Sequence, residues 1–295
     1  MKIKTLVTVS SSLVLSLLPQ VASAVSPSTT INSINKYAYA ANFGWIDFSG
    51  DFYNGAIIGQ YVCSGYIYSA NVGWIHLGNG APANQIQYQN NSATDYGVNH
   101  DGLGNLRGYA YGANIGWINF ENIGLPKFDL ATGKLSGSIY SANCGWISLS
   151  NAVVFVQTGS MSQGTLAANG LPVAWLMSNF GTTAVDPLID ADGDGVSNLQ
   201  EYLAGTNPNQ SGNLLRITAY NFAPGGTSVS LTWASVPTRF YKIQKSTNLT
   251  AGSWTDSGLG MIPPTSLSTT AGFSDAGSPT HFYRVEAVLP LQPPN

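Results

Sequence analysis

Apolar side chains alternate with polar or aromatic ones over short runs in the first half of the chain. Four segments share this pattern and align without gaps: INKYAYAANFGWIDF, CSGYIYSANVGWIHL, LRGYAYGANIGWINF and LSGSIYSANCGWISL. A period of two residues is typical of β-strands that bury one face. In each segment two such runs flank Ala-Asn-x-Gly, and Asn and Gly tolerate the positive φ angles of a tight connection. The pattern therefore predicts four β-hairpins.

The two faces of each predicted hairpin differ in chemistry. One face is aliphatic, and we expect it to form the core. The other is aromatic, and a connection of five residues would place each Tyr opposite the Trp of its own hairpin. The aliphatic face contains Ile34, Cys63, Leu106, Leu135, Ala38, Ile67, Ala110, Ile139, Ile46, Ile75, Ile118 and Ile147. The aromatic face contains Tyr39, Trp45, Tyr68, Trp74, Tyr111, Trp117, Tyr140 and Trp146.

The aromatic face has two interpretations. In the first, neighbouring repeat units cover the rings, and we expect this arrangement because a contiguous exposed patch of that size is unusual in a monomer. In the second, the rings stay open to solvent and stack on sugars or other flat apolar ligands. Beyond each Trp this face carries Asp47, His76, Asn119 or Ser148, which places a polar edge beside the rings.

The hairpin segments recur at intervals typical of stacked or radially repeated architectures, whose units bury their faces only against one another. Upstream of the third and fourth hairpins, YGVNHDGLGN and PKFDLATGK read as a further strand and turn, so we expect three strands in a full unit. The interval before the third hairpin is lengthened by the polar segment GNGAPANQIQYQNNSATD, which predicts a loop.

After a Gly/Ser-rich linker the pattern changes to helical spacing. The segment LPVAWLMSNFG predicts a helix that begins near Pro172 and ends at Gly181. It is followed by the acidic segment DADGDGVSNLQEY and by a second helix, capped by Ser197 and ended by Gly205. Ca²⁺ takes oxygen ligands from positions 1, 3, 5, 7, 9 and 12 of a single contiguous loop. These positions are occupied by Asp190, Asp192, Asp194, Val196 through its carbonyl, Asn198 and Glu201.

The segment DPLIDADGDGVSNLQEYLAGTNP resembles the calcium-binding segments of thrombospondin type 3 and dockerin-like modules, which occur in large secreted bacterial proteins. The resemblance implies Ca²⁺ as the cofactor. The segment differs from a paired EF-hand, because Ser197 stands where an EF-hand has an apolar residue and no second loop is visible. We therefore expect a structural ion and not a conformational sensor.

From Leu214 the chain returns to short alternating runs separated by turn signals such as APGG and AGSP. This pattern predicts an antiparallel β-sandwich with Trp233, Tyr241, Trp254 and Tyr283 in its core. The stretches LTWASVPTRFYKIQKSTNLTAGSW and HFYRV resemble fibronectin type III-like modules at the ends of secreted bacterial proteins. The fold class predicted for the whole chain is mainly β: a four-copy β-repeat domain, a short helix-loop-helix calcium module and a sandwich.

The N-terminal segment combines Lys2 and Lys4, an apolar run, and the small residues Ala22 and Ala24, which is typical of a cleaved secretory signal peptide. The apolar run is shorter than the ~20 residues of a membrane-spanning helix, so we expect no transmembrane anchor in the mature chain. The predicted boundaries are 1–24 for the signal peptide, 25–157 for the repeats, 158–170 for a linker, 171–212 for the calcium module, 213–290 for the sandwich and 291–295 for a tail.

The charge of the chain bears on its partners, and its two cysteines bear on a disulfide. Charged residues make up 8% of the chain and the formal net charge is −3, so nucleic acid is not an expected partner. The two cysteines, Cys63 and Cys144, stand at positions that are apolar in the other repeats. In an exported chain they form either one disulfide or two buried free thiols, and the sequence leaves both open.

The sequence shows no convergent acids, bases or nucleophiles, and its three histidines are scattered, so we do not expect an enzyme. We expect an exported, calcium-binding structural or adhesive protein of the bacterial cell surface or extracellular matrix, with the periplasm as a second location. Its expected partners are calcium and either glycans or other surface proteins. The alternative is a carbohydrate-binding protein that uses the Tyr/Trp face.

Overall fold

The structure is a computed structural model that describes residues 29–51, 53–223, 228–275 and 282–292. The predicted signal peptide lies outside these residues. The fold is mainly β, as the sequence predicts. The described chain divides into two compact units, one formed by residues 29–185 with 291–292 and the other by residues 186–290.

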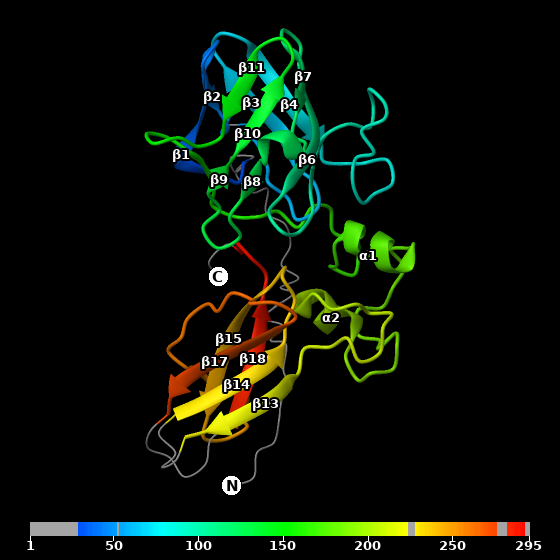
Figure 1. The fold of residues 1–295 in the computed structure, drawn as a ribbon. Helices are drawn as coiled ribbons and strands as arrows, with labels where there is room; N and C mark the ends of the chain where they lie inside the picture. The colour runs from blue at the N-terminus through cyan, green and yellow to red at the C-terminus, as the bar shows by residue number, and fades with distance from the viewer. Residues whose placement is uncertain (1–28, 52, 224–227, 276–281, 293–295) are drawn as a thin grey trace, which may run out of the picture. The chain divides into compact units, whose positions relative to one another are not determined.

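The first unit is built on a closed β-barrel (Figure 1). Its four hairpins pair edge to edge in the order β11-β10-β7-β6-β4-β3-β2-β1, and β11 then pairs with β1 to close the ring. The barrel strands are β1 (Ile31–Ala40), β2 (Gly44–Asp47), β3 (Ser64–Ser69), β4 (Gly73–Asn79), β6 (Leu106–Gly112), β7 (Gly116–Asn119), β10 (Ser138–Ser141) and β11 (Gly145–Ser148).

The predicted third strand is present in the third and fourth repeats, where it pairs with the residues that precede the hairpin. The additional elements are β5 (Val98–His100), η1 (Asn122–Gly124), β8 (Lys127–Phe128), β9 (Leu135–Ser136) and β12 (Val156–Thr158). The two third strands, β5 and β8, pair antiparallel at equivalent positions: β5 places His100 opposite Leu106 at the start of β6, and β8 places Phe128 opposite Leu135 of β9. In the second repeat the same position forms an isolated bridge, between Ile57 and Ser64.

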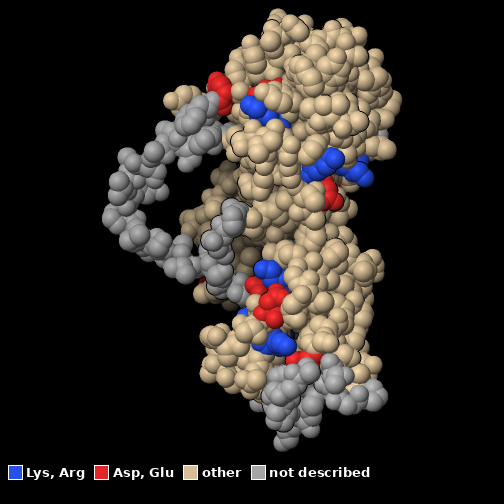
Figure 2. All heavy atoms as spheres, turned by 90° about the vertical axis from the view of Figure 1, so that its left-hand side faces the viewer, with Lys and Arg blue, Asp and Glu red and all other residues tan. Residues whose placement is uncertain are grey.

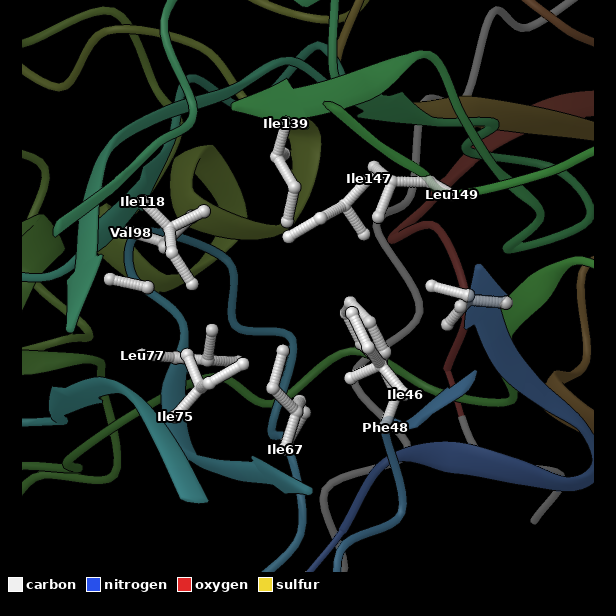
Figure 3. Close-up of a cluster of buried hydrophobic side chains, with 14 of the residues drawn as sticks. Ile46, Phe48, Ile67, Ile75, Leu77, Val98, Ile118, Ile139, Ile147 and Leu149 are labelled. Atoms are coloured by element: carbon white, nitrogen blue, oxygen red, sulfur yellow. The ribbon is translucent and has the colours of Figure 1, made fainter. Parts of the chain in front are cut away.

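The aliphatic face of the hairpins lines the barrel interior, as predicted (Figure 3). Eleven of the twelve predicted core positions are buried, and the exception is Ile34, which is 80% exposed. The register of β1 shifts between Ile31 and Lys36, and the Asn32 Oδ1 atom there accepts hydrogen bonds from the backbone N–H groups of Ile34 and Asn35. This bulge breaks the alternation on which the prediction for Ile34 depends.

The variable residue of Ala-Asn-x-Gly closes one end of the barrel. Phe43, Val72 and Ile115 are buried in the same cluster as the barrel interior, and Cys144 packs against it. The variable position therefore accepts Phe, Val, Ile or Cys, because each of these apolar side chains is stabilised when it is removed from water.

The recurrent asparagine joins neighbouring hairpins. The Nδ2 groups of Asn71, Asn114 and Asn143 donate to the carbonyls of Phe43, Val72 and Ile115, over 2.8 to 3.1 Å. The Asn42 Nδ2 donates to the Cys144 carbonyl at 2.9 Å and completes the circle. In the turns only the glycines have positive φ, so the predicted backbone role of the asparagines is wrong. We call these four bonds the asparagine ring.

One α-helix, α1 (Val173–Phe180), follows the barrel in the chain. It begins after Pro172 and ends at Gly181, whose φ is +66°, as predicted. Among the described residues, no helix is long and apolar enough to span a bilayer.

The second unit contains α2 (Asn198–Ala204), η2 (Ala251–Ser253) and two three-stranded antiparallel sheets. The sheets share one buried cluster, which includes Trp233, Tyr241 and Tyr283. Trp254 was predicted in this core but is only half-buried, with the Arg284 guanidinium 4.5 Å from its ring centre. The sheets are β13 (Ile217–Phe222), β14 (Ser228–Ala234) with β17 (Ser268–Ser274), and β16 (Thr255–Asp256), β15 (Phe240–Ser246) with β18 (Phe282–Val288).

We expect Asn114→Ala to destabilise the barrel by about 0.5 to 1 kcal/mol, because the Val72 carbonyl loses its donor. Asn114→Asp has the same shape and favours turns, but it cannot donate to a carbonyl. It should therefore cost at least as much as Asn114→Ala. Amide hydrogen exchange of barrel peptides measures both variants, and a harmless Asn114→Asp would show that the asparagine serves the turn alone.

Buried His100 makes the barrel sensitive to acid. Its Nε2 accepts from the Gly104 N–H at 2.9 Å, so its Nδ1 carries the proton and donates to the Gly59 carbonyl at 3.0 Å. Burial lowers the pKa of His100, while the nearby Asp101 charge opposes this shift. The unfolded chain takes up a proton near pH 6.5, where the folded ring stays neutral. The stabilisation is complete above that pH and is lost as the pH falls below it.

We therefore expect protection of barrel amides to fall as the pH drops below about 6.5, by up to about 1.4 kcal/mol per pH unit for this one group. His100→Gln should flatten the profile in this range at some cost in stability. An unchanged slope in His100→Gln would show that other groups cause the acid sensitivity.

Candidate functional site

The predicted calcium loop folds with its acidic side chains turned together. Asp190, Asp192 and Asp194 are half-buried, while the residues between them are exposed. One carboxylate oxygen of each lies within 4.8 Å of the other two. Among the described residues this is the one group of three or more acidic, His or Cys side chains with metal-binding spacing.

Backbone N–H groups fix the loop around Asp190. The Gly193 N–H donates to its Oδ1 at 2.7 Å and the Gly195 N–H donates to its Oδ2 at 2.6 Å. These bonds, the one from Gly195 above all, lower the pKa of Asp190. Gly195 has φ of +92°, which gives the sharp turn expected at this position. Across the loop, the Gly212 N–H donates to the Asp194 Oδ2 at 3.1 Å.

Helix α2 buries Glu201 beside these carboxylates. The helix is capped by Ser197 and ended by Gly205, as predicted. The Glu201 side chain has no exposed surface, and neither carboxylate oxygen has a hydrogen-bond partner. Burial, followed by the charges of Asp192 and Asp194, raises the pKa of Glu201 to about 7. Burying a charged carboxylate lowers the stability of the fold unless a hydrogen bond or an opposite charge compensates it.

Two further oxygens near the loop are also buried without hydrogen-bond partners, namely Asn198 Oδ1 and Asp192 Oδ2. Asn198 is held in place through its Nδ2, which donates to the Asp186 carbonyl at 2.9 Å. The loop therefore presents several hard oxygen ligands that the protein itself leaves unsatisfied. The role of the Val196 carbonyl stays a prediction.

The far end of α2 is attached to the sheets of its own unit. The Arg239 guanidinium donates to the carbonyls of Tyr202 and Leu203 at 2.6 and 2.8 Å, and Ala204 belongs to the core between the sheets. The acidic loop and α2 belong to this second unit, whereas α1 belongs to the first.

The aromatic residues of the four hairpins lie on the outside of the barrel. We call them the aromatic belt: Tyr39, Trp45, Tyr68, Trp74, Tyr111, Trp117, Tyr140 and Trp146. Their exposed fractions range from 37% for Tyr140 to 50% for Trp45, so the expectation that neighbouring units cover these rings is wrong. The physical reason is the closure of the sheet: each hairpin pairs with the next one edge to edge, so the hairpins do not stack over each other's outer faces.

Within the belt each Tyr faces the Trp of its own hairpin, as predicted. The ring centres of the four pairs are 4.9 to 5.0 Å apart, with interplanar angles between 54° and 66°. Such edge-to-face and tilted contacts stabilise aromatic pairs by roughly 0.5 to 1.5 kcal/mol beyond the area that they bury.

The two cysteines do not form the disulfide that the sequence left open. Cys63 is buried in the barrel core, which raises the pKa of its thiol to about 12. Cys144 lies in the turn between β10 and β11, at the closed end of the barrel. Both thiols occupy apolar positions of the repeat and act there as small hydrophobic side chains.

No family model, curated protein or solved structure matches the chain. The resemblances to thrombospondin type 3, dockerin-like and fibronectin type III-like modules therefore stay predictions from the sequence.

We expect Trp117→Ala to lower the free energy of unfolding of the barrel by about 1 to 2 kcal/mol, because the ring is half-exposed and loses mainly its aromatic contacts. This is less than the roughly 3 to 5 kcal/mol of a buried aromatic residue. Ile118→Ala removes the next side chain of β7, which is fully buried, and should cost more. Hydrogen exchange of barrel peptides compares the two, and an equal or larger loss in Trp117→Ala would contradict the exposure of the belt.

Proposed function

We propose that the acidic loop binds one Ca²⁺ ion. The ligands are Asp190, Asp192, Asp194, the Val196 carbonyl, Asn198 and Glu201. The observation that carries this proposal is Glu201, a fully buried carboxylate without a hydrogen-bond partner next to three further carboxylates. A cation between these groups turns their repulsion into coordination.

The chemistry of the ligands favours calcium. They are all oxygens, which suit a hard cation, and the loop has the length and spacing that give Ca²⁺ six to eight ligands. Mg²⁺ requires a stricter octahedral arrangement and retains water, so it should bind this loop more weakly. Extracellular calcium modules bind with dissociation constants of roughly 10⁻⁴ to 10⁻³ M.

The proposed role of the ion is structural. In the part of the chain that the structure describes, no second acidic loop of this kind is present, and α2 is fixed to the sheets through Arg239 and Ala204. An ion bound there would rigidify the loop and stabilise the unit to which it belongs.

The wider function is that of an exported, non-enzymatic structural or adhesive protein of the cell surface or matrix. The signal-peptide pattern and the low charge of the chain support export and an extracellular setting. The two sheets of the second unit are consistent with a β-sandwich of fibronectin type III-like kind, which would serve as a spacer or attachment module.

The calcium proposal predicts opposite effects of Glu201→Gln in the absence and presence of the ion. In EDTA the variant should be at least as stable as the parent chain, since it removes an uncompensated buried charge. Free calcium at about 100 times its dissociation constant should stabilise the parent by roughly 2.7 kcal/mol and the variant by far less. Thermal unfolding of the full chain with and without calcium measures both effects.

Glu286→Gln in β18 is the matched control, because it removes one carboxylate of the same unit outside the loop. It should leave the calcium response unchanged. Isothermal titration calorimetry provides the direct test: absence of heat at millimolar calcium, or a full response in Glu201→Gln, would rule out this site.

A further inference from the structure

One of the four junctions between hairpins carries more aromatic rings than the others. Where β4 meets β6, His76 lies opposite Tyr111 of the next hairpin and opposite Tyr66 of its own. Tyr96, which belongs to no hairpin, adds a further ring: its centre lies 4.9 Å from that of Trp117 and the two planes meet at 89°. We call Tyr66, His76, Tyr96, Tyr111 and Trp117 the aromatic corner.

The rings of the aromatic corner form one continuous series of contacts. Tyr66 and His76 have ring centres 4.7 Å apart, and His76 and Tyr96 are 5.5 Å apart. The Tyr96 hydroxyl and the His76 Nδ1 share a hydrogen bond of 2.8 Å. Trp117 then contacts Tyr111 at 5.0 Å. Tyr66, Tyr111 and Trp117 remain exposed, so the corner is accessible to a ligand.

Tyr96 directly follows the polar segment that lengthens the third repeat, in the loop between β4 and β5, and this loop is held by packing and hydrogen bonds. Tyr88 is buried at its centre, and its ring fills the space above Gly78 and Gly97, where any Cβ atom would lie within 2.5 Å of Tyr88. Buried Asp95 accepts hydrogen bonds from the backbone N–H groups of Ala83 and Gln89. The loop therefore holds Tyr96 at the junction of β4 and β6, against His76 and Trp117.

The charge of the aromatic corner limits the ligands that fit it. No residue of the corner is acidic, Lys or Arg, and burial lowers the pKa of His76 and raises that of Tyr96, which keeps both side chains neutral at pH 7. The nearest acidic residue along the chain, Asp95, is buried, and its carboxylate accepts backbone hydrogen bonds. The rings of the corner thus offer their faces, phenolic hydroxyls and an indole N–H, and carry no charge themselves. A neutral sugar matches this chemistry, because its ring has an apolar C–H face and an edge of hydroxyl groups.

We propose that the aromatic corner is a binding site for neutral oligosaccharides, with Tyr96 and Trp117 as the two rings that hold a sugar unit. This site goes beyond the proposed calcium function and does not depend on it. The other three junctions have the belt residues but lack the ring that the loop supplies, so they serve as internal controls within the same barrel.

The test is isothermal titration calorimetry of the full chain with cellohexaose, chitohexaose and mannohexaose as neutral probes and a hexamer of galacturonic acid as the charged one. We expect at least one neutral probe to bind and the acidic hexamer to bind at least tenfold more weakly. Tyr96→Ala and Trp117→Ala should each weaken binding of that probe about tenfold, since a lost aromatic contact of about 1.4 kcal/mol is tenfold in affinity.

The matched control is Trp45→Ala, which removes the equivalent ring at the junction of β11 and β1, where binding should change less than twofold. Tyr96→Phe keeps the ring and removes the hydrogen bond to His76, so it should retain most of the affinity even if Tyr96→Ala disturbs the loop. Thermal unfolding of each variant separates lost binding from lost folding.

Three results would overturn the proposal. The first is the absence of binding by every neutral probe. The second is an equal loss of affinity in Trp45→Ala and Trp117→Ala, which would make the whole belt an unspecific surface. The third is concentration-dependent dimerisation in sedimentation experiments that Trp117→Ala abolishes, which would make the corner an interface between two copies of the chain.

Discussion

Every hairpin of the first unit must find a partner for both of its edges, and the barrel is the solution to this constraint. An unpaired strand edge leaves backbone donors and acceptors unsatisfied and invites pairing with another chain. Four hairpins of one design meet the requirement by pairing in a circle, with β11 returning to β1. The asparagine ring follows the same circle: each turn donates one side-chain hydrogen bond to its neighbour, and the last bond joins the fourth turn to the first.

Closure also determines which side chains are available for function. Once the sheet is a barrel, its interior has room only for the aliphatic face, and the apolar residue of each turn closes one end. The aromatic face is left outside with no further layer to cover it. Repetition makes four equivalent surfaces, and the loop that carries Tyr96 distinguishes one of them. An insertion that is present in only one of the four repeats thus marks, in the sequence, the place where the outer surface differs from its other three copies.

The sequence predicted what is local and missed what is not. A period of two residues was sufficient for the hairpins, their two faces and the Tyr–Trp pairs, because these depend on neighbours along one strand or across one turn. The closure depends on the contact between the first and the last hairpin, which no local pattern encodes. Because closure was not predicted, the exposure of the aromatic rings was not predicted either. The prediction that Ile34 is buried was wrong because the Asn32 side chain accepts hydrogen bonds from the nearby backbone and the strand register shifts there. For the acidic loop, spacing predicted that Asp190, Asp192 and Asp194 lie together, but it could not reveal that Glu201 is buried without a hydrogen-bond partner.

The two units differ in how they treat charged side chains. In the barrel the ion pair between Lys36 and Asp47, at 2.7 Å, is partly exposed and contributes little, so apolar burial and backbone pairing hold the fold. In the second unit a short helix places a carboxylate in a fully buried position among other carboxylates, an arrangement that is unfavourable by itself. The rest of that unit therefore has to offset the free-energy cost of burying this carboxylate. A cation bound as we propose would remove that cost, because it would coordinate the carboxylate.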